Sequence, residues 1–169
     1  MGKHHYLIAL GSNMRHVRYG SPRRVIAAAL TALDHGKLEV RAASKVIETT
    51  PLGPSRRRYA NAAAIIHGKR DPEQMLHKLR KIEQAFGRRR TGLEWGARVL
   101  DLDIILWSGG AWADEGDEAS LVIPHPAFRD RDFVLHPAAA IAGTWRDPLT
   151  GLTVKQLSAR LTKPHPAPR

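Results

Sequence analysis

Apolar residues recur along the chain with two periods, and segments of the two kinds alternate. Short apolar runs are typical of buried strands, while apolar positions every three or four residues are typical of amphipathic helices. The expected order is a strand over 6–10, a helix over 22–35, strands over 38–49 and 59–66, a helix over 72–86 and a strand over 99–107. This β-α-β-β-α-β order predicts a ferredoxin-like α+β fold, an antiparallel sheet with helices packed on it.

Local signals mark both ends of the second helix. Asp71 is a typical N-cap, Pro72 suits the first helical position, and Gln74 can complete a capping box. Gly87 can end the helix, because glycine readily adopts the left-handed conformation found there. These signals give the second helix the best-defined boundaries of any predicted element.

The C-terminal third carries weaker patterns. After residue 107 they predict a glycine-containing acidic loop, an extra short strand over 121–123 and short helices. We expect a single domain over 1–162. The residues over 163–169 are rich in proline, which predicts a disordered tail.

The composition is ordinary except for the charge. The 169 residues include 27 Lys and Arg against 16 Asp and Glu, a net charge of +11, and no cysteine. The lack of cysteine excludes disulfide frameworks and thiol catalysis, and a positive surplus indicates an anionic partner. No apolar run is long enough to span a membrane, and the polar start does not resemble a signal peptide. We therefore expect a cytoplasmic protein.

The charge is unevenly distributed. Residues 51–100 carry 12 basic and 4 acidic side chains, whereas residues 101–118 carry 6 acidic and no basic ones. A nucleic-acid surface is more often one continuous basic patch. A basic stretch next to carboxylates favours a site that holds both phosphates and a metal ion.

Two carboxylates begin the predicted strand over 99–107. Asp101 and Asp103 are two positions apart, so a strand presents both on the same face. Such a pair is stable when a cation lies between the carboxylates, and Mg²⁺ takes one or two carboxylates together with phosphate oxygens. The alternatives are a solvated pair and a pair held by arginine. The preceding Arg98 and the arginines before it favour the metal, since they could neutralise a polyphosphate.

Three consecutive basic residues, 88–90, follow the end of the second helix. They could be a solvated run that complements the helix dipole. Glycines bound the segment, however, so it could also close over a triphosphate as a lid. Trp95 lies within it and could pack on the core or close on an aromatic substrate.

Several single residues are further candidates. Glu83 shares the apolar face of the second helix, where a carboxylate is disfavoured unless it pairs with an arginine or contacts a ligand. Tyr59 and Asn61 point to the same side of their strand and, with Thr49, could form a small polar and aromatic pocket. Ordinary sheet packing is the alternative for these three. His125 has the same ambiguity between surface residue and catalyst.

Taken together, these pieces resemble the 6-hydroxymethyl-7,8-dihydropterin pyrophosphokinases of folate synthesis. The matching segments follow in order, and the ten-residue run WGARVLDLDI is the most specific of them. No Walker A or Rossmann glycine motif competes with this interpretation. The segments are LIALGSN over 7–13, TTPLGP over 49–54, YANAA over 59–63, Ile82-Glu83 with Gly87-Arg88, WGARVLDLDI over 95–104, and Pro124-His125 with Arg131-Asp132-Phe133.

The resemblance implies diphosphate transfer from ATP to the hydroxymethyl group of 6-hydroxymethyl-7,8-dihydropterin, with release of AMP. It implies that Asp101 and Asp103 bind two Mg²⁺ ions and that Arg88 and Arg90 are catalytic lid arginines. It further implies that the pterin is bound by Thr49, Leu52, Tyr59, Asn61, Trp95 and Phe133, and ATP by Glu83, Arg98, Ile104, His125 and Arg131.

A second interpretation is a ferredoxin-like RNA-binding module, which has the same element order and would explain the charge. It requires aromatic residues on exposed strands, yet only 6% of the residues are aromatic. It also gives no reason for the paired aspartates. We therefore expect ATP and the dihydropterin as partners of a monomer, without nucleic acid or membrane.

Overall fold

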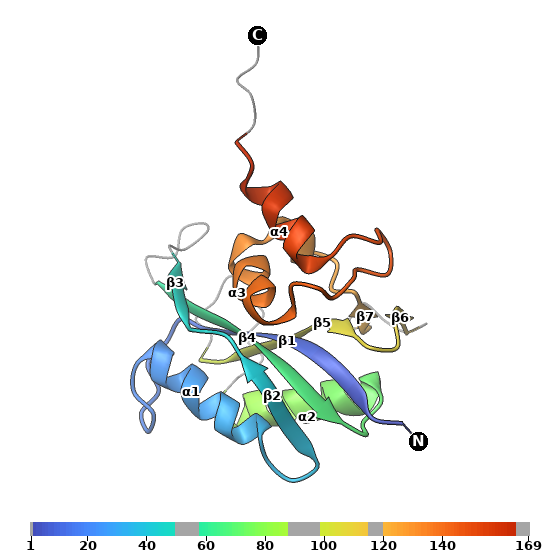
Figure 1. Ribbon diagram of the computed structural model, residues 1–169. Coiled ribbons are helices and arrows are strands. Elements are labelled where there is room, and N and C mark those ends of the chain that lie inside the picture. Colours follow the sequence, from blue (N-terminus) through green and yellow to red (C-terminus); the bar gives the residue numbers. More distant parts are fainter. Residues whose placement is uncertain (1, 50–57, 88–98, 115–119, 165–169) are drawn as a thin grey trace.

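The computed structural model describes residues 2–49, 58–87, 99–114 and 120–164. Its main sheet is antiparallel, with the strand order β2-β4-β1-β5, and β3 also pairs with β4 (Figure 1). The strands are β1 (His4–Ser12), β2 (Leu38–Ala43), β3 (Ile47–Thr49), β4 (Tyr59–Gly68) and β5 (Asp101–Trp107). This arrangement confirms the predicted α+β fold with a ferredoxin-like sheet.

Helices cover both faces of the sheet. Helices α1 (Pro22–Leu33) and α2 (Pro72–Ala85) lie on one face, and α3 (Asp132–Ala142) and α4 (Val154–Thr162) lie on the other (Figure 1). The strand period of two explains the two cores, because alternate residues of one strand enter different layers. Ile8 of β1 packs with α1 and α2, whereas its neighbour Leu7 packs with α3 and α4.

The expected capping box of α2 is confirmed. The Asp71 carboxylate accepts a hydrogen bond from the Gln74 backbone at 2.9 Å, and the Gln74 side chain accepts one from the Asp71 backbone at 3.1 Å. These bonds satisfy backbone N–H groups of the first helical turn. Near the other end of α2, Glu83 is buried and its carboxylate faces β5, where it accepts a hydrogen bond from Leu102 N.

The single strand expected over 38–49 is wrong, because the structure divides it into β2 and β3. Ser44 lies between them, and its hydroxyl accepts a hydrogen bond from the backbone of Ala63 at 2.9 Å. A side chain thus takes the place of part of the ladder, and β3 continues along β4 only from Ile47. This break places Thr49 opposite Tyr59.

The C-terminal third contains more structure than its pattern predicts. The expected strand is β7 (Val122–Ile123), which pairs with a strand that the sequence does not signal, β6 (Trp112–Ala113). A short 3-10 helix, η1 (Phe128–Asp130), precedes α3. Among the residues described, no helix is both long enough and apolar enough to cross a membrane.

Candidate functional site

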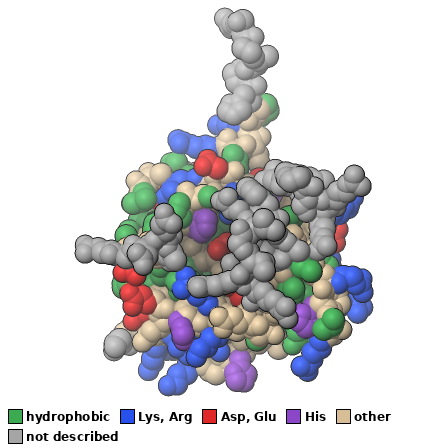
Figure 2. Space-filling view, turned by 180° about the vertical axis from the view of Figure 1, so that it is seen from behind, with side chains coloured by type: hydrophobic (Ala, Val, Ile, Leu, Met, Phe, Trp, Pro, Cys, Tyr) green, Lys and Arg blue, Asp and Glu red, His purple; other side chains and the backbone are tan. Residues whose placement is uncertain are grey.

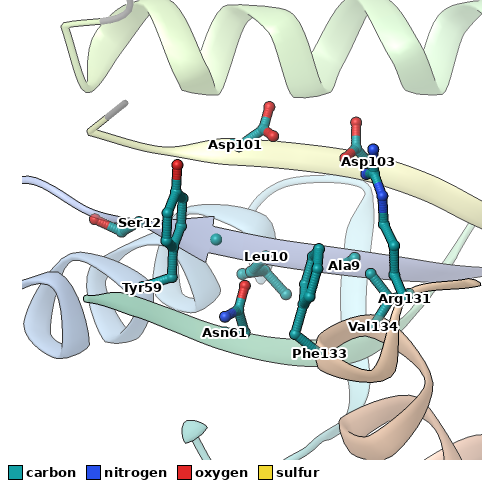
Figure 3. Close-up of a pocket in the computed structure, with 11 residues that line it drawn as sticks. Ala9, Leu10, Ser12, Tyr59, Asn61, Asp101, Asp103, Arg131, Phe133 and Val134 are labelled. Atoms are coloured by element: carbon teal, nitrogen blue, oxygen red, sulfur yellow. The ribbon is translucent and has the colours of Figure 1, made fainter. Parts of the chain in front are cut away.

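The two predicted metal-binding carboxylates lie side by side on one face of β5 (Figure 3). Antiparallel pairing places Asp101 opposite Gly11 and Asp103 opposite Ala9 on β1. The residues between and beyond the aspartates, Leu102 and Ile104, point the other way into the core. The strand therefore separates its polar and apolar positions as the alternation predicts.

A pocket opens on this face at the end of the sheet. Gly11 lies between Asn61 of β4 and Asp101 of β5 in a single row across three strands. A Cβ atom on Gly11 would stand 3.4 Å from Asn61 Oδ1, so glycine keeps this row open. The pocket is lined by Ala9, Leu10, Gly11, Ser12, Tyr59, Asn61, Asp101, Asp103, Arg131, Phe133 and Val134.

Two aromatic rings stand in the pocket on either side of Asn61. Tyr59 comes from β4, and Phe133 comes from the first turn of α3 (Figure 3). Both side chains are half-buried. A flat heterocycle bound between them would present its edge to the amide of Asn61, and aromatic faces favour stacking on such a ring.

The amide of Asn61 is held in a fixed orientation. Its side chain is buried, and Nδ2 donates a hydrogen bond to Thr49 Oγ1 at 3.0 Å. The structure therefore joins Thr49, Tyr59 and Asn61 in one cluster, as the strand positions predicted. A buried amide with one fixed bond retains further donor and acceptor capacity for a polar ligand edge.

Arg131 lines the pocket, and His125 lies near enough to Arg131 and Asp101 for their charges to act on its ring. His125 is half-buried, its backbone N–H donates to Ile105 O at 3.0 Å, and its Nδ1 accepts from the Ala127 backbone at 3.2 Å. Burial, and next the charge of Arg131, lower the pKa of His125, while Asp101 acts in the opposite direction. A neutral ring with Nδ1 as acceptor carries its proton on Nε2.

Arg131 faces both an aromatic ring and a carboxylate. Its guanidinium lies 5.8 Å from the centre of the Phe133 ring, and its side chain extends toward Asp103 (Figure 3). On the surface, acidic side chains and a histidine lie at a hollow of the face shown in Figure 2. A cation beside two aspartates fits a site that holds a strongly charged ligand with its counter-ions.

Two of the expected ATP residues make other contacts in the structure. Glu83 is 3% exposed, and its Oε1 accepts a hydrogen bond from the backbone of Leu102 at 2.8 Å. Ile104 is 3% exposed, pairs with Ile8 of β1 and packs its side chain in the core with α1 and α2. Contact of either residue with ATP stays a prediction.

Five predicted site residues lie outside the residues that the structure describes. They are Leu52, Arg88, Arg90, Trp95 and Arg98. The sequence interpretation missed the pocket floor made by Ala9, Gly11 and Ser12. The signal for this floor is the alternation of small residues in the run over 9–12.

The donor set suits a magnesium ion bound together with phosphates. Among the residues described, no group of three or more His, Cys, Asp or Glu side chains could hold a metal ion. Two neighbouring carboxylates match the needs of Mg²⁺, which completes its shell with phosphate oxygens and water. The protein thus has a ferredoxin-like α+β fold with a pocket that combines two aromatic rings, a buried amide and two carboxylates.

Comparisons with known proteins identify the family. Residues 7–143 match the family model described as 7,8-dihydro-6-hydroxymethylpterin-pyrophosphokinase (HPPK). The chain belongs to this family. The 2-amino-4-hydroxy-6-hydroxymethyldihydropteridine pyrophosphokinase of Synechocystis is 35% identical, over 91% of this chain and 74% of the relative. The enzyme of the same name from Pseudomonas aeruginosa is 36% identical, over 83% of this chain and 82% of the relative.

Some similar proteins are much longer. The Folate synthesis bifunctional protein of Arabidopsis thaliana is 34% identical over 82% of this chain, which spans only 27% of that protein. The crystal structure of wild-type Plasmodium falciparum HPPK-DHPS superposes on 94% of this chain with a TM-score of 0.73 and 12% identity, and the match covers 45% of its length. At that identity the likeness supports the fold alone.

Proposed function

We propose that this chain transfers diphosphate from ATP to the hydroxymethyl group of 6-hydroxymethyl-7,8-dihydropterin, which releases AMP and provides a step of folate synthesis. The observation that carries the proposal is the row Asn61–Gly11–Asp101, which brings a pocket with an amide and two aromatic rings next to paired carboxylates. The family assignment supports the same reaction.

The lining of the pocket supports the proposal that it binds the pterin. Tyr59 and Phe133 would bind the two faces of the ring, and Asn61 would bind its polar edge. The hydrogen bond to Thr49 fixes the amide before the ligand arrives, which lowers the entropy cost of binding. The hydroxymethyl group would then point along the row toward Asp101.

The carboxylates would hold magnesium with ATP, and we propose two ions on the basis of the resemblance. Asp101 and Asp103 are the residues that would bind them. When bound, Mg²⁺ neutralises phosphate charge and polarises the phosphoryl oxygens. Arg131 adds a fixed positive charge at the same place, and His125 can donate from Nε2 to a phosphate oxygen.

The reaction requires alignment more than covalent chemistry from the protein. The hydroxymethyl oxygen attacks the β-phosphorus of ATP and loses its proton to solvent, the bond from that phosphorus to the α-phosphate oxygen breaks, and AMP leaves with that oxygen. The pocket holds the attacking oxygen on one side, and the charged groups bind the phosphates on the other. Arg88 and Arg90, outside the described residues, are proposed to close over the phosphates as lid arginines.

The RNA-binding alternative is disfavoured by the second helical layer. Modules of that kind present an open sheet face for base stacking. Here α3 and α4 pack on the face opposite α1 and α2, and Leu7, Ala63 and Ile105 of the strands are buried beneath them. We propose a cytoplasmic monomer whose partners are ATP and the dihydropterin, without nucleic acid or membrane.

The test is AMP release from ATP and Mg²⁺ in the presence of 6-hydroxymethyl-7,8-dihydropterin. We expect AMP and the dihydropterin diphosphate in equal amounts, and folded protein that releases no AMP would refute the proposal. Asp103→Ala should abolish turnover and leave pterin binding largely intact. The matched control is Asp114→Ala, which removes an exposed carboxylate outside the pocket. Undiminished turnover in Asp103→Ala would contradict the assignment of the metal.

A further inference from the structure

A buried ion pair joins η1 to the turn between α3 and α4. The Asp147 side chain is fully buried, and Arg129 donates to it from Nε at 2.6 Å and from Nη2 at 2.8 Å. The same carboxylate accepts from Thr150 Oγ1 at 2.7 Å and from the Leu149 backbone at 3.0 Å. Burial raises the pKa of this carboxyl, but the four bonds and the charge of Arg129 outweigh it and lower the pKa to about 2. The pair therefore stays ionised at every pH at which the protein would work.

The carboxylate belongs to a rigid turn between α3 and α4. The Gly151 backbone donates to Asp147 O at 2.8 Å, and the Asp147 backbone donates to Leu152 O at 2.9 Å. The turn thus has its own backbone closure on both sides of Asp147. It provides a fixed point to which another segment can be tied.

The guanidinium belongs to η1, the segment that leads into the pocket. Arg129 stacks 4.7 Å from the ring centre of its buried neighbour Phe128. Two residues further, Arg131 lines the pocket, and Phe133 lines it after two more. A displacement of η1 therefore moves a proposed phosphate-binding cation and one of the two stacking rings together.

Backbone bonds alone hold η1 weakly. Its turn bonds are long, at 3.2 Å for Phe128 N to His125 O, 3.3 Å for Asp130 N to Ala127 O and 3.4 Å for Arg131 N to Phe128 O. Isolated 3-10 turns have poorer hydrogen-bond geometry than an α-helix and are easily deformed. The bidentate pair to Asp147 is shorter and charge-assisted, so together with the buried Phe128 ring it ties η1 to the turn after α3.

We propose that Arg129 and Asp147 are positioning residues, which set where Arg131 and Phe133 stand and thereby determine the affinity for the pterin. The inference rests on the proposed function, since the pterin is the ligand whose binding it governs. Neither residue touches the pocket. They act through η1, and the planar fork of arginine is required because lysine cannot make both bonds.

The test compares pterin affinity with stability in a small set of variants. Arg129→Lys keeps the charge and loses the fork, and Asp147→Asn keeps the shape and loses the charge. Arg146→Ala is the matched control in the same turn, since Arg146 Nη1 donates to Gly151 O at 2.8 Å without a bond to η1. Val25→Ala is the second control, a cavity in the other core that lowers stability far from η1.

The readouts are the dissociation constant of 6-hydroxymethyl-7,8-dihydropterin by fluorescence titration, the KM and kcat for AMP release, and the Tm. We expect Arg129→Lys and Asp147→Asn to raise the pterin dissociation constant and KM about tenfold, within the range for small misplacements of binding groups. Arg146→Ala and Val25→Ala should keep the wild-type constant, even where Val25→Ala lowers the Tm as much as Arg129→Lys does.

The outcomes separate the two proposals. A folded Arg129→Lys protein with wild-type affinity overturns the positioning role and leaves the proposed function intact. An equal loss of affinity in Val25→Ala also overturns it, because the effect would then follow stability alone. Wild-type protein that neither binds the pterin nor releases AMP overturns the proposed function and the inference together. Should Asp147→Asn fail to fold, Arg129→Lys alone decides.

Discussion

Replacement of Glu83 tests how the aspartates are kept in place. Its carboxylate is 3% exposed and accepts the N–H of Leu102, the residue between Asp101 and Asp103, at 2.8 Å. In Glu83→Ala this N–H loses its acceptor within a buried environment. Glu83→Gln retains an acceptor oxygen and loses only the charge, so the two variants separate hydrogen bonding from electrostatics.

The loss of stability expected in Glu83→Ala can be estimated, because the hydrogen bond that it removes is buried. A hydrogen bond to a charged group contributes about 1.5–3 kcal/mol, and a buried donor left without a partner costs about 1–3 kcal/mol. These two figures describe the same loss from different reference states, so they are not added. For Glu83→Ala we expect a decrease of about 3 kcal/mol in the free energy of unfolding, equivalent to about 6–12 °C in Tm for a chain of this size. Glu83→Gln should lose about 1 kcal/mol.

Loss of the bond between Glu83 and β5 should also change the dependence of AMP release on Mg²⁺. Because Leu102 is fixed between the two aspartates, its release should disturb both carboxylates, and we expect the Mg²⁺ concentration needed for half-maximal AMP release to rise several-fold in Glu83→Ala. Urea unfolding measures the stability, and magnesium titration of AMP release measures the site. Gln84→Ala is the control, an exposed neighbour on the same helix. Equal stability and equal magnesium dependence in Glu83→Ala and Gln84→Ala would refute the reasoning.

Three further predictions follow from single groups. The pKa of Asp147 is about 2 in the folded protein and 3.8 ordinarily, so the ionised carboxylate stabilises the fold by about 2 kcal/mol above pH 3.8. This contribution is lost as the pH falls from 3.8 through 2. Urea unfolding between pH 2 and 5 should show the loss in the wild-type protein and not in Asp147→Asn. Burial, and next the charge of Arg131, lower the pKa of His125, so we expect its ring to take up a proton when ATP phosphates bind. Calorimetry in two buffers of different ionisation enthalpy should detect this uptake, and identical apparent enthalpies would contradict it. Gly11→Val should raise the pterin KM at least tenfold with a small change in Tm, because a Cβ atom there already contacts Asn61 Oδ1 at 3.4 Å and the two valine methyl groups would fill the pocket. An unchanged KM would show that the pocket floor is not part of the site.

Features of the fold that depend on neighbouring residues in the sequence were predictable. The capping box of Asp71 and Gln74 and the alternation around Asp101 and Asp103 act within a few residues, so the sequence alone indicates them. The break at Ser44 was not predictable, because its hydroxyl bonds to Ala63, which is distant in the sequence. Long-range contacts of this kind depend on which strands become neighbours.

In the candidate site, too, local features were predictable and long-range contacts were not. Strand spacing brought Tyr59 and Asn61 to one side, and the structure adds the hydrogen bond to Thr49. The sequence interpretation offered arginine or ligand as the partner of Glu83, and the observed partner includes a backbone N–H, which no side-chain pattern signals. The pair of Arg129 and Asp147 was missed as well, since it forms only after the turn between α3 and α4 closes.

The position of β5 at the edge of the main sheet has a consequence for solubility. An edge strand offers unpaired backbone groups to other chains, and the apolar run over 104–107 would be a favourable template for aggregation. Two contacts block this edge, the Glu83 carboxylate on Leu102 N–H and the His125 N–H on Ile105 O. The elements that support the carboxylates thus also protect the chain from self-association, and their loss should be seen first as intermolecular β-sheet in the refolding protein.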